Sequence, residues 1–111
     1  MHILYVSINR NPKGLMDAKK ELMQIVAELK NVDDMEQLWT ELLTPKELEA
    51  LSLRWQLLKE LHEGEPQRAI AARHKISLCK ITRGSKILKK TNSVTLKLLN
   101  KYYSKKEKRD E

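Results

Sequence analysis

Apolar residues recur at intervals of three and four along most of this chain from Leu15 onward, and this spacing limits the possible folds more than any other feature. It places the apolar side chains on one face of a helix, whereas a half-buried strand needs strict alternation. Glycine and proline number three each, and aromatic residues make up 5% of the sequence, which is the usage of helices. The sequence therefore predicts an all-α fold. The first two helices are marked by Leu15, Ala18, Leu22, Ile25, Val26 and Leu29, and by Met35, Leu38, Trp39, Leu42 and Leu43, with a break at residues 31–34.

The third predicted helix has the best-defined start. Thr44 is a favourable N-cap, Pro45 suits the first helical position, and Glu47 stands where a capping box needs an acidic residue. The apolar face that follows is wide and needs more than one partner. A chain of 111 residues buries only a small core, so we expect a homodimer. That face carries Leu48, Leu51, Trp55, Leu58 and His62, with Leu57 and Leu61 beside it and Gly64 placed to end the helix; Trp39 and Trp55 are assigned to core packing rather than to a ligand site.

Several classes of protein are excluded by what the sequence lacks. The apolar run Ile3–Ile8 is too short for a signal peptide or a membrane span, and no longer run exists, so we expect no membrane association. Cys79 is the single cysteine, which rules out an internal disulfide and favours a reducing, cytoplasmic location. The histidines are scattered without metal-ligand spacing, and there is no paired-carboxylate site, activated nucleophile or phosphate loop. We therefore expect neither a metal site nor an enzyme.

The charges are divided unevenly between the two halves of the chain. Residues 1–65 hold 8 basic and 12 acidic residues, whereas residues 66–111 hold 14 basic and 3 acidic ones. The stretch from Pro66 to Lys106 contains twelve basic residues and no acidic one. Such a stretch repels itself unless an anionic partner covers it, and a solvated basic face is the alternative. We expect a flexible arm over residues 1–14, one helical domain over residues 15–106, and a charged tail over residues 107–111.

Part of the basic stretch has the layout of a helix-turn-helix over about residues 67–90. A helix is predicted from Gln67 to His74, then a three-residue turn, then a helix from about Leu78 to Lys90. Ala71 is small enough for two helices to cross closely, and Ser77 can cap the second helix. The turn commonly starts with glycine, which tolerates a left-handed backbone, but Lys75 stands there in this chain. The residues expected to turn inward are Ile70, Ile76, Ile81 and Leu88.

The outward face of the second helix is predicted to read DNA. Lysine and arginine side chains supply phosphate contacts, while residues near the start of the helix can reach base edges. Arg68, in the first helix of the motif, can reach a guanine edge or the backbone. The predicted DNA-binding residues are Gln67, Arg68, Leu78, Cys79, Lys80, Thr82, Arg83, Lys86, Lys89 and Lys90.

The string Ile81-Thr82-Arg83-Gly84-Ser85, together with Leu43-Thr44-Pro45 and further positions over about residues 40–91, resembles the bacterial tryptophan repressor family. The string Ile81-Thr82-Arg83-Gly84-Ser85 is the most specific part of the resemblance. It implies an intertwined dimer with six helices in each chain, the last near residues 94–103, and two helix-turn-helix heads that enter successive major grooves of a palindromic operator. The other matching residues are Leu43-Thr44-Pro45, Glu47, Glu49-Ala50-Leu51, Arg54, Glu60-Leu61, Gly64-Glu65 and Leu88-Lys89.

The resemblance also implies L-tryptophan as a corepressor, with no other cofactor. Arg54 and Arg83 would hold the indole ring between planar guanidinium groups. Thr44 would help hold the carboxylate, and main-chain carbonyls around Glu41 and Leu43 the amino group. Gly84 would leave room beside the ring.

This chain departs from the family pattern at three positions. Ile87 replaces a serine that contacts the ligand's amino group, Lys80 replaces a threonine of the second motif helix, and Ala71 replaces a lysine of the first. One residue is also missing between Glu65 and Arg68.

The expected function is therefore that of a tryptophan-activated repressor of tryptophan biosynthesis or transport genes. Two alternatives remain open from the sequence. One is a regulator of the same fold with another ligand or none, in which Ile87 closes the pocket. The other is a sequence-tolerant nucleic-acid-binding protein that depends on its basic half alone.

Overall fold

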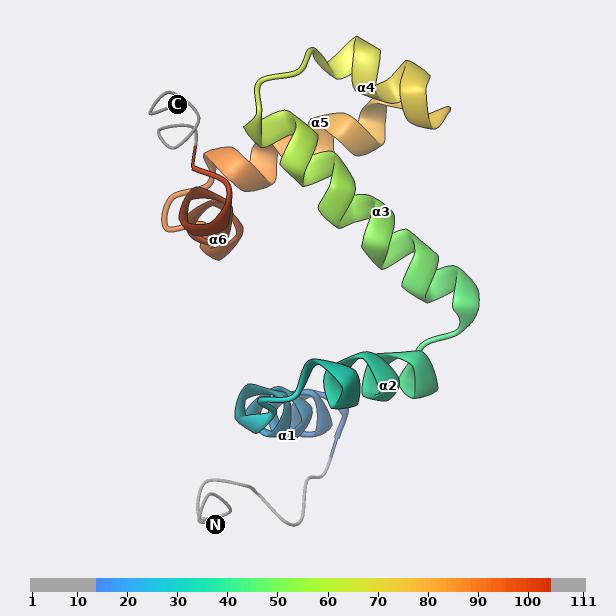
Figure 1. The fold of residues 1–111 in the computed structure, drawn as a ribbon, viewed down its shortest axis with the longest axis vertical. Helices are drawn as coiled ribbons and strands as arrows, with labels where there is room; N and C mark the ends of the chain where they lie inside the picture. Colours follow the sequence, from blue (N-terminus) through green and yellow to red (C-terminus); the bar gives the residue numbers. More distant parts are fainter. Residues whose placement is uncertain (1–13, 105–111) are drawn as a thin grey trace. The chain divides into compact units, whose positions relative to one another are not determined.

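The computed structural model describes residues 14–104, and these residues form α-helices without a strand, as the apolar spacing predicts (Figure 1). The all-α fold class is thereby confirmed. None of the helices in this described range is long and apolar enough to cross a bilayer. The predicted arm lies almost wholly outside the described residues, and the predicted tail lies entirely outside them. In chain order the helices are α1 (Leu15–Glu28), α2 (Val32–Leu42), α3 (Pro45–His62), α4 (Gln67–His74), α5 (Leu78–Lys89) and α6 (Val94–Tyr102).

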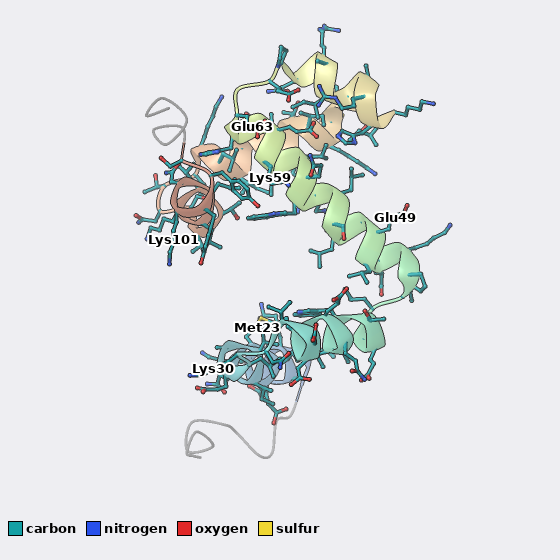
Figure 2. The ribbon with its side chains drawn as sticks, viewed as in Figure 1. Met23, Lys30, Glu49, Lys59, Glu63 and Lys101 are labelled. Atoms are coloured by element: carbon teal, nitrogen blue, oxygen red, sulfur yellow. The ribbon has the colours of Figure 1, made fainter. Side chains whose placement is uncertain are left out.

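The chain divides into two compact units, of which the first is Met1–Pro45 and contains α1 and α2. The Asn31 side chain accepts hydrogen bonds from the backbone N–H groups of Asp33 at 2.7 Å and Asp34 at 3.2 Å, so α2 starts inside the predicted break. Neither helix buries a residue. Met23, for example, is 46% exposed (Figure 2). The apolar faces of α1 and α2 are therefore left largely uncovered.

The second unit, Lys46–Glu111, has a small core where α3, α4 and α5 meet. Leu57 of α3, Ile70 of α4 and Ile81 of α5 are buried there, and the two isoleucines are fully so. Ala71 and Ile76 pack against them, as predicted for the crossing of the two motif helices. Three converging helices thus fix the position of α5, the helix predicted to read DNA.

The end of α3 follows from Gly64. This residue has a φ of 94°, a left-handed conformation that glycine adopts without steric cost. The Gly64 N–H donates to the Leu61 carbonyl at 3.0 Å, and the Glu65 N–H donates to the Glu60 carbonyl at 3.1 Å. This pair of bonds is a Schellman motif, which ends the helix where the sequence predicts.

One local prediction is wrong. Ser77 occupies the N-cap position of α5, but its side chain makes no capping hydrogen bond. Trp55, assigned to core packing, is 37% exposed in the single chain, so its packing partner stays a prediction. Leu51, one turn earlier on the same face, is 47% exposed. A wide apolar face on α3 is present, as predicted, but part of it is open.

Candidate DNA-reading surface and ligand pocket

The helix-turn-helix is formed by α4, the turn at residues 75–77, and α5, which pack against each other (Figure 1). The turn begins at Lys75, whose φ of 55° and ψ of 48° lie in the left-handed region. Its N–H bonds back to the Ala72 carbonyl at 3.3 Å, and the Ile76 N–H bonds to the Ala71 carbonyl at 3.1 Å. A lysine therefore takes the conformation that glycine usually supplies, and the motif keeps its geometry.

The predicted DNA-reading face of α5 is exposed. Thr82 Oγ1 donates to Gln67 Oε1 at 3.3 Å, which links α5 to the start of α4. Neither α4 nor α5 contains an acidic residue, so a phosphate approaching this face meets only basic and neutral side chains. Gln67 is half-buried, and the other nine predicted residues are exposed: Arg68, Leu78, Cys79, Lys80, Thr82, Arg83, Lys86, Lys89 and Lys90.

A polar cluster that the sequence did not predict joins α4 to α3. The side chain of Glu60 on α3 is 7% exposed and accepts hydrogen bonds from Arg73 at 2.6 Å and from Gln56 at 2.7 Å. His74 Nε2 lies 3.0 Å from the same carboxylate. Arg73 also bonds to Glu65. His74 is thus a structural partner of Glu60.

Opposing effects set the pKa of Glu60. Burial alone raises the pKa of a carboxylic acid, because the charged form loses hydration. Hydrogen bonds from Gln56 and His74, together with the charges of His74 and Arg73, outweigh burial and lower the pKa of Glu60 below its ordinary value. The carboxylate is therefore ionised at neutral pH and holds the last turn of α4 against α3.

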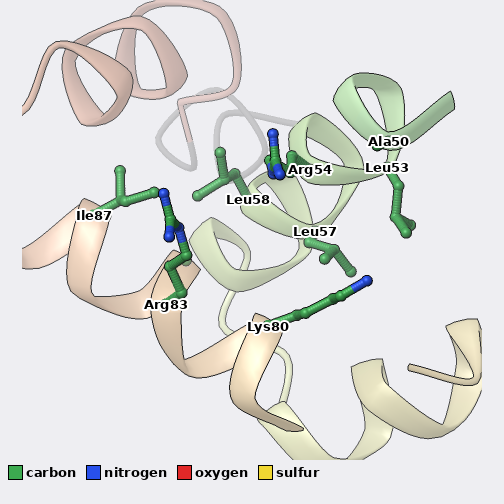
Figure 3. A pocket seen from close by; sticks show the side chains of 9 residues that line it. Ala50, Leu53, Arg54, Leu57, Leu58, Lys80, Arg83 and Ile87 are labelled. Atoms are coloured by element: carbon green, nitrogen blue, oxygen red, sulfur yellow. The ribbon is translucent and has the colours of Figure 1, made fainter. Parts of the chain in front are cut away.

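A pocket of about 270 Å³ lies between α3 and α5, within the second unit (Figure 3). Its apolar wall includes the buried leucines Leu57 and Leu58 and the buried Gly84. In Figure 3, Leu58 lies between the side chains of Arg54 and Arg83, and Lys80 extends below Leu57. The lining residues are Ala50, Leu53, Arg54, Leu57, Leu58, Lys80, Arg83, Gly84 and Ile87.

Gly84 marks a close approach of the two helices beside this pocket. A Cβ atom at position 84 would lie 3.0 Å from Leu61 Cδ1 and 3.5 Å from Leu58 Cδ2. The first distance is tighter than ordinary van der Waals contact, so glycine lets α5 approach α3 more closely than alanine would without a shift of Leu61.

Four of the six residues predicted to bind tryptophan line this pocket, namely Arg54, Arg83, Gly84 and Ile87. The other two, Leu43 and Thr44, belong to the first unit. Lys80, predicted only for DNA binding, is also a lining residue. It stands three, four and seven residues before Arg83, Gly84 and Ile87, and this helical spacing is a signal that could have revealed its place.

The comparison with protein families matches residues 18–103, a range that covers nearly all of the six helices, to a model described as Trp repressor protein. The chain belongs to the Trp repressor protein family. It is accordingly a DNA-binding, helix-turn-helix transcription regulator of the repressor type. Neither the comparison with curated proteins nor that with solved structures gave a match. Within this Trp repressor family member, the exposed basic face of α5 and the pocket behind it share one helix.

Proposed function

We propose that this protein is a homodimeric repressor whose affinity for a palindromic operator is raised by L-tryptophan, and that it controls tryptophan biosynthesis or transport genes. The observation that carries the proposal is the pocket behind α5. Arg83, Gly84 and Ile87 line it, so a ligand there contacts the helix that presents the DNA-reading face.

The ligand would act on the position of α5. Its indole ring would lie on the apolar wall near the planar guanidinium groups of Arg54 and Arg83, which suit both an aromatic face and a carboxylate. Binding then favours the arrangement of α3 and α5 in which the pocket is filled, and this is a shift in populations without chemistry. A coupling of ordinary size would raise DNA affinity by a factor of about 5–150.

The exposed apolar residues support the homodimer. Leu51 and Trp55 of α3 are 47% and 37% exposed, and Val32 of α2 is 78% exposed. Leu15 and Met16 of α1 are 89% and 71% exposed. Apolar exposure of this extent marks a surface that another molecule covers, and a second copy with two-fold symmetry is the commonest solution. Two copies would present two α5 helices, which is what a palindromic site requires.

A titration of operator DNA tests the proposal. Duplexes with a palindromic trp-type operator and with a random sequence of equal length are titrated with the full chain, with and without L-tryptophan, at fixed salt. We expect the palindrome to be preferred and L-tryptophan to strengthen its binding. Arg54→Ala should lose the tryptophan effect, whereas Lys97→Gln, an exposed change on α6 outside the pocket, should keep it.

Two results would count against the proposal. A DNA affinity that does not change with L-tryptophan would instead indicate a regulator of the same fold with another ligand or none. In that alternative, the Ile87 side chain in the pocket wall closes the pocket to L-tryptophan. Equal affinity for both duplexes, with a steep salt dependence, would indicate sequence-tolerant binding by the basic half alone. A sedimentation coefficient that corresponds to a monomer, measured at the protein concentrations of the titration, would contradict the homodimer.

A further inference from the structure

The first helix of the motif, α4, is short and takes its orientation from its surroundings. It packs against α5 and buries one side chain, Ile70, in the core. A helix of eight residues is marginal on its own, so its tertiary contacts decide how it lies. Pro66 at its N-cap position makes no capping hydrogen bond, and its end passes directly into the left-handed Lys75. The polar contacts near the two ends of α4 are therefore important for its orientation.

At the end of α4, Arg73 connects two carboxylates that come from outside the helix. Its Nη1 donates to Glu60 on α3 at 2.6 Å, and its Nη2 donates to Glu65 in the loop that precedes α4. A planar guanidinium group can hold two carboxylates through two different nitrogens, a geometry that lysine does not reproduce. We call Glu60, Glu65 and Arg73 the arginine clamp. Because two carboxylates neutralise Arg73, we do not expect it to contact a phosphate.

At the start of α4, a second bond joins the helix to the DNA-reading face. Gln67 accepts a hydrogen bond from Thr82 on α5 at 3.3 Å, and the exposed Arg68 follows directly. Ile70 lies midway, three residues from Gln67 and three from Arg73. A tilt of about 15° about the buried Ile70 shifts each end by roughly 1 Å, since three residues rise about 4.5 Å. A tilt that breaks the clamp therefore also moves the start of α4 relative to α5.

We propose that the arginine clamp is a positioning device for DNA recognition. By holding the last turn of α4, it sets the place of Gln67 and Arg68 beside the reading face of α5, and thereby the preference for an operator over a random duplex. Arg73 is a positioning residue that acts through α4 without touching DNA. The inference rests on the proposed function, because it requires an operator that the two motif helices read.

Glu65 is the decisive position, because charge and positioning have opposite effects there. Glu65→Gln removes a negative charge close to the basic motif, so electrostatics alone strengthens binding to every duplex. The clamp predicts instead a weaker preference for the operator, because Arg73 loses one of its two partners. Glu63→Gln is the matched control. It removes the same charge two residues earlier, where Glu63 is exposed directly after α3 and belongs to neither bond of the clamp.

Fluorescence anisotropy titrations of the full chain test the inference. A palindromic trp-type operator and a random duplex of equal length are used at fixed salt, with and without L-tryptophan. We expect Glu65→Gln and Arg73→Lys each to lower the ratio of the two affinities by about three- to tenfold, because each loses one partly exposed bond between charged groups. Glu63→Gln should leave the ratio unchanged. Arg73→Lys keeps the net charge, so charge alone predicts no effect of this exchange.

The salt dependence distinguishes positioning from direct contact with DNA. Arg73→Gln should lower the ratio and leave the slope of log affinity against log salt unchanged, because Arg73 makes no phosphate contact. Lys86→Gln, on the reading face, should reduce that slope. All titrations are made at a temperature at which circular dichroism gives each variant the helical signal of the parent chain. A lowered ratio is then not a folding defect.

The outcomes separate this inference from the proposed function. An unchanged ratio in Glu65→Gln and Arg73→Lys overturns the inference and leaves the proposed repressor intact. A reduced salt slope in Arg73→Gln also overturns it, because Arg73 would then contact phosphates. A lowered ratio, together with DNA affinities that do not change with L-tryptophan, supports the clamp and overturns tryptophan activation. Equal affinity of the parent chain for the two duplexes overturns both, because there is then no operator preference for the clamp to set.

Discussion

Replacing Glu60 by glutamine should destabilise the protein more than any other single exchange of a carboxylate for an amide in the described residues. The Glu60 carboxylate is 7% exposed and accepts bonds from Arg73 at 2.6 Å and Gln56 at 2.7 Å, with His74 at 3.0 Å. An amide has one acceptor oxygen and one donor nitrogen. After the exchange, at least one of the three groups that donate to Glu60 would therefore face the donor nitrogen of the new amide. The loss of a hydrogen bond between charged groups costs about 1.5–3 kcal/mol.

The expected cost lies in the lower half of that range. The Arg73 side chain is 45% exposed, so water replaces part of what it loses. We expect Glu60→Gln to lower the free energy of unfolding by about 2 kcal/mol, which corresponds to a fall in Tm on the order of 10 °C. Glu63→Gln is the matched control, because Glu63 is exposed directly after the end of the same helix (Figure 2) and belongs to none of these bonds. We expect it to stay within about 0.5 kcal/mol of the parent chain.

The pH dependence gives a second test of the same cluster. Because folding lowers the pKa of Glu60, its contribution to stability is present above the ordinary pKa of 4.5 and is lost as the pH falls through the folded value. The difference in unfolding free energy between the parent chain and Glu60→Gln should therefore shrink on acidification. Urea unfolding followed by circular dichroism measures both quantities. A Glu60→Gln chain as stable as Glu63→Gln, or a difference that does not shrink below about pH 4.5, would refute the reasoning.

Three further changes have defined outcomes. Lys75→Gly should raise the free energy of unfolding by about 0.5–1 kcal/mol, because the φ of 55° at this position strains a residue with a Cβ; a loss of stability in thermal unfolding would contradict this. Ile87→Ser should strengthen L-tryptophan binding severalfold in calorimetry, because a hydroxyl in the pocket wall can accept a bond from the amino group; unchanged binding would show that Ile87 does not limit the affinity for L-tryptophan. Lys86→Gln should reduce the slope of log affinity against log salt for operator DNA by about 2, because each of the two copies loses one phosphate contact, and an unchanged slope would place Lys86 away from the phosphates.

The helix-turn-helix could be predicted from the sequence almost residue by residue. Gln67–His74 and the start at Leu78 are correct, and α5 ends at Lys89, one residue before the predicted end. The reason is that the inward positions follow helical spacing and the turn is short, so local signals suffice. The end of α3 could be predicted for the same reason, because it depends on the left-handed conformation of Gly64, which a glycine residue can adopt without help from distant contacts.

The contacts that fix α4 against α3 could not be predicted, because they join residues 13 and 14 positions apart. Glu60 stands among leucines in a helix, and nothing local shows that its partners come from the end of α4. Trp55 is the opposite case. Its spacing correctly places it on the apolar face of α3, but spacing does not reveal whether the same chain or another molecule covers that face.

The proposed action of a ligand on α5 depends on the arrangement around Gly84. Ile81 anchors the helix in the core, and at Gly84 it comes so close to α3 that a Cβ would lie 3.0 Å from Leu61 Cδ1. Since close-packed helices resist being pushed together or apart, the proposed ligand beside Gly84 would change the tilt of α5 more easily than its distance from α3. A tilt about Gly84 displaces the residues farthest from it most, and among these are Cys79 and Lys80 near the start of α5. In the proposed mechanism, a small change in the pocket would therefore reach the end of the helix that is predicted to meet the base edges.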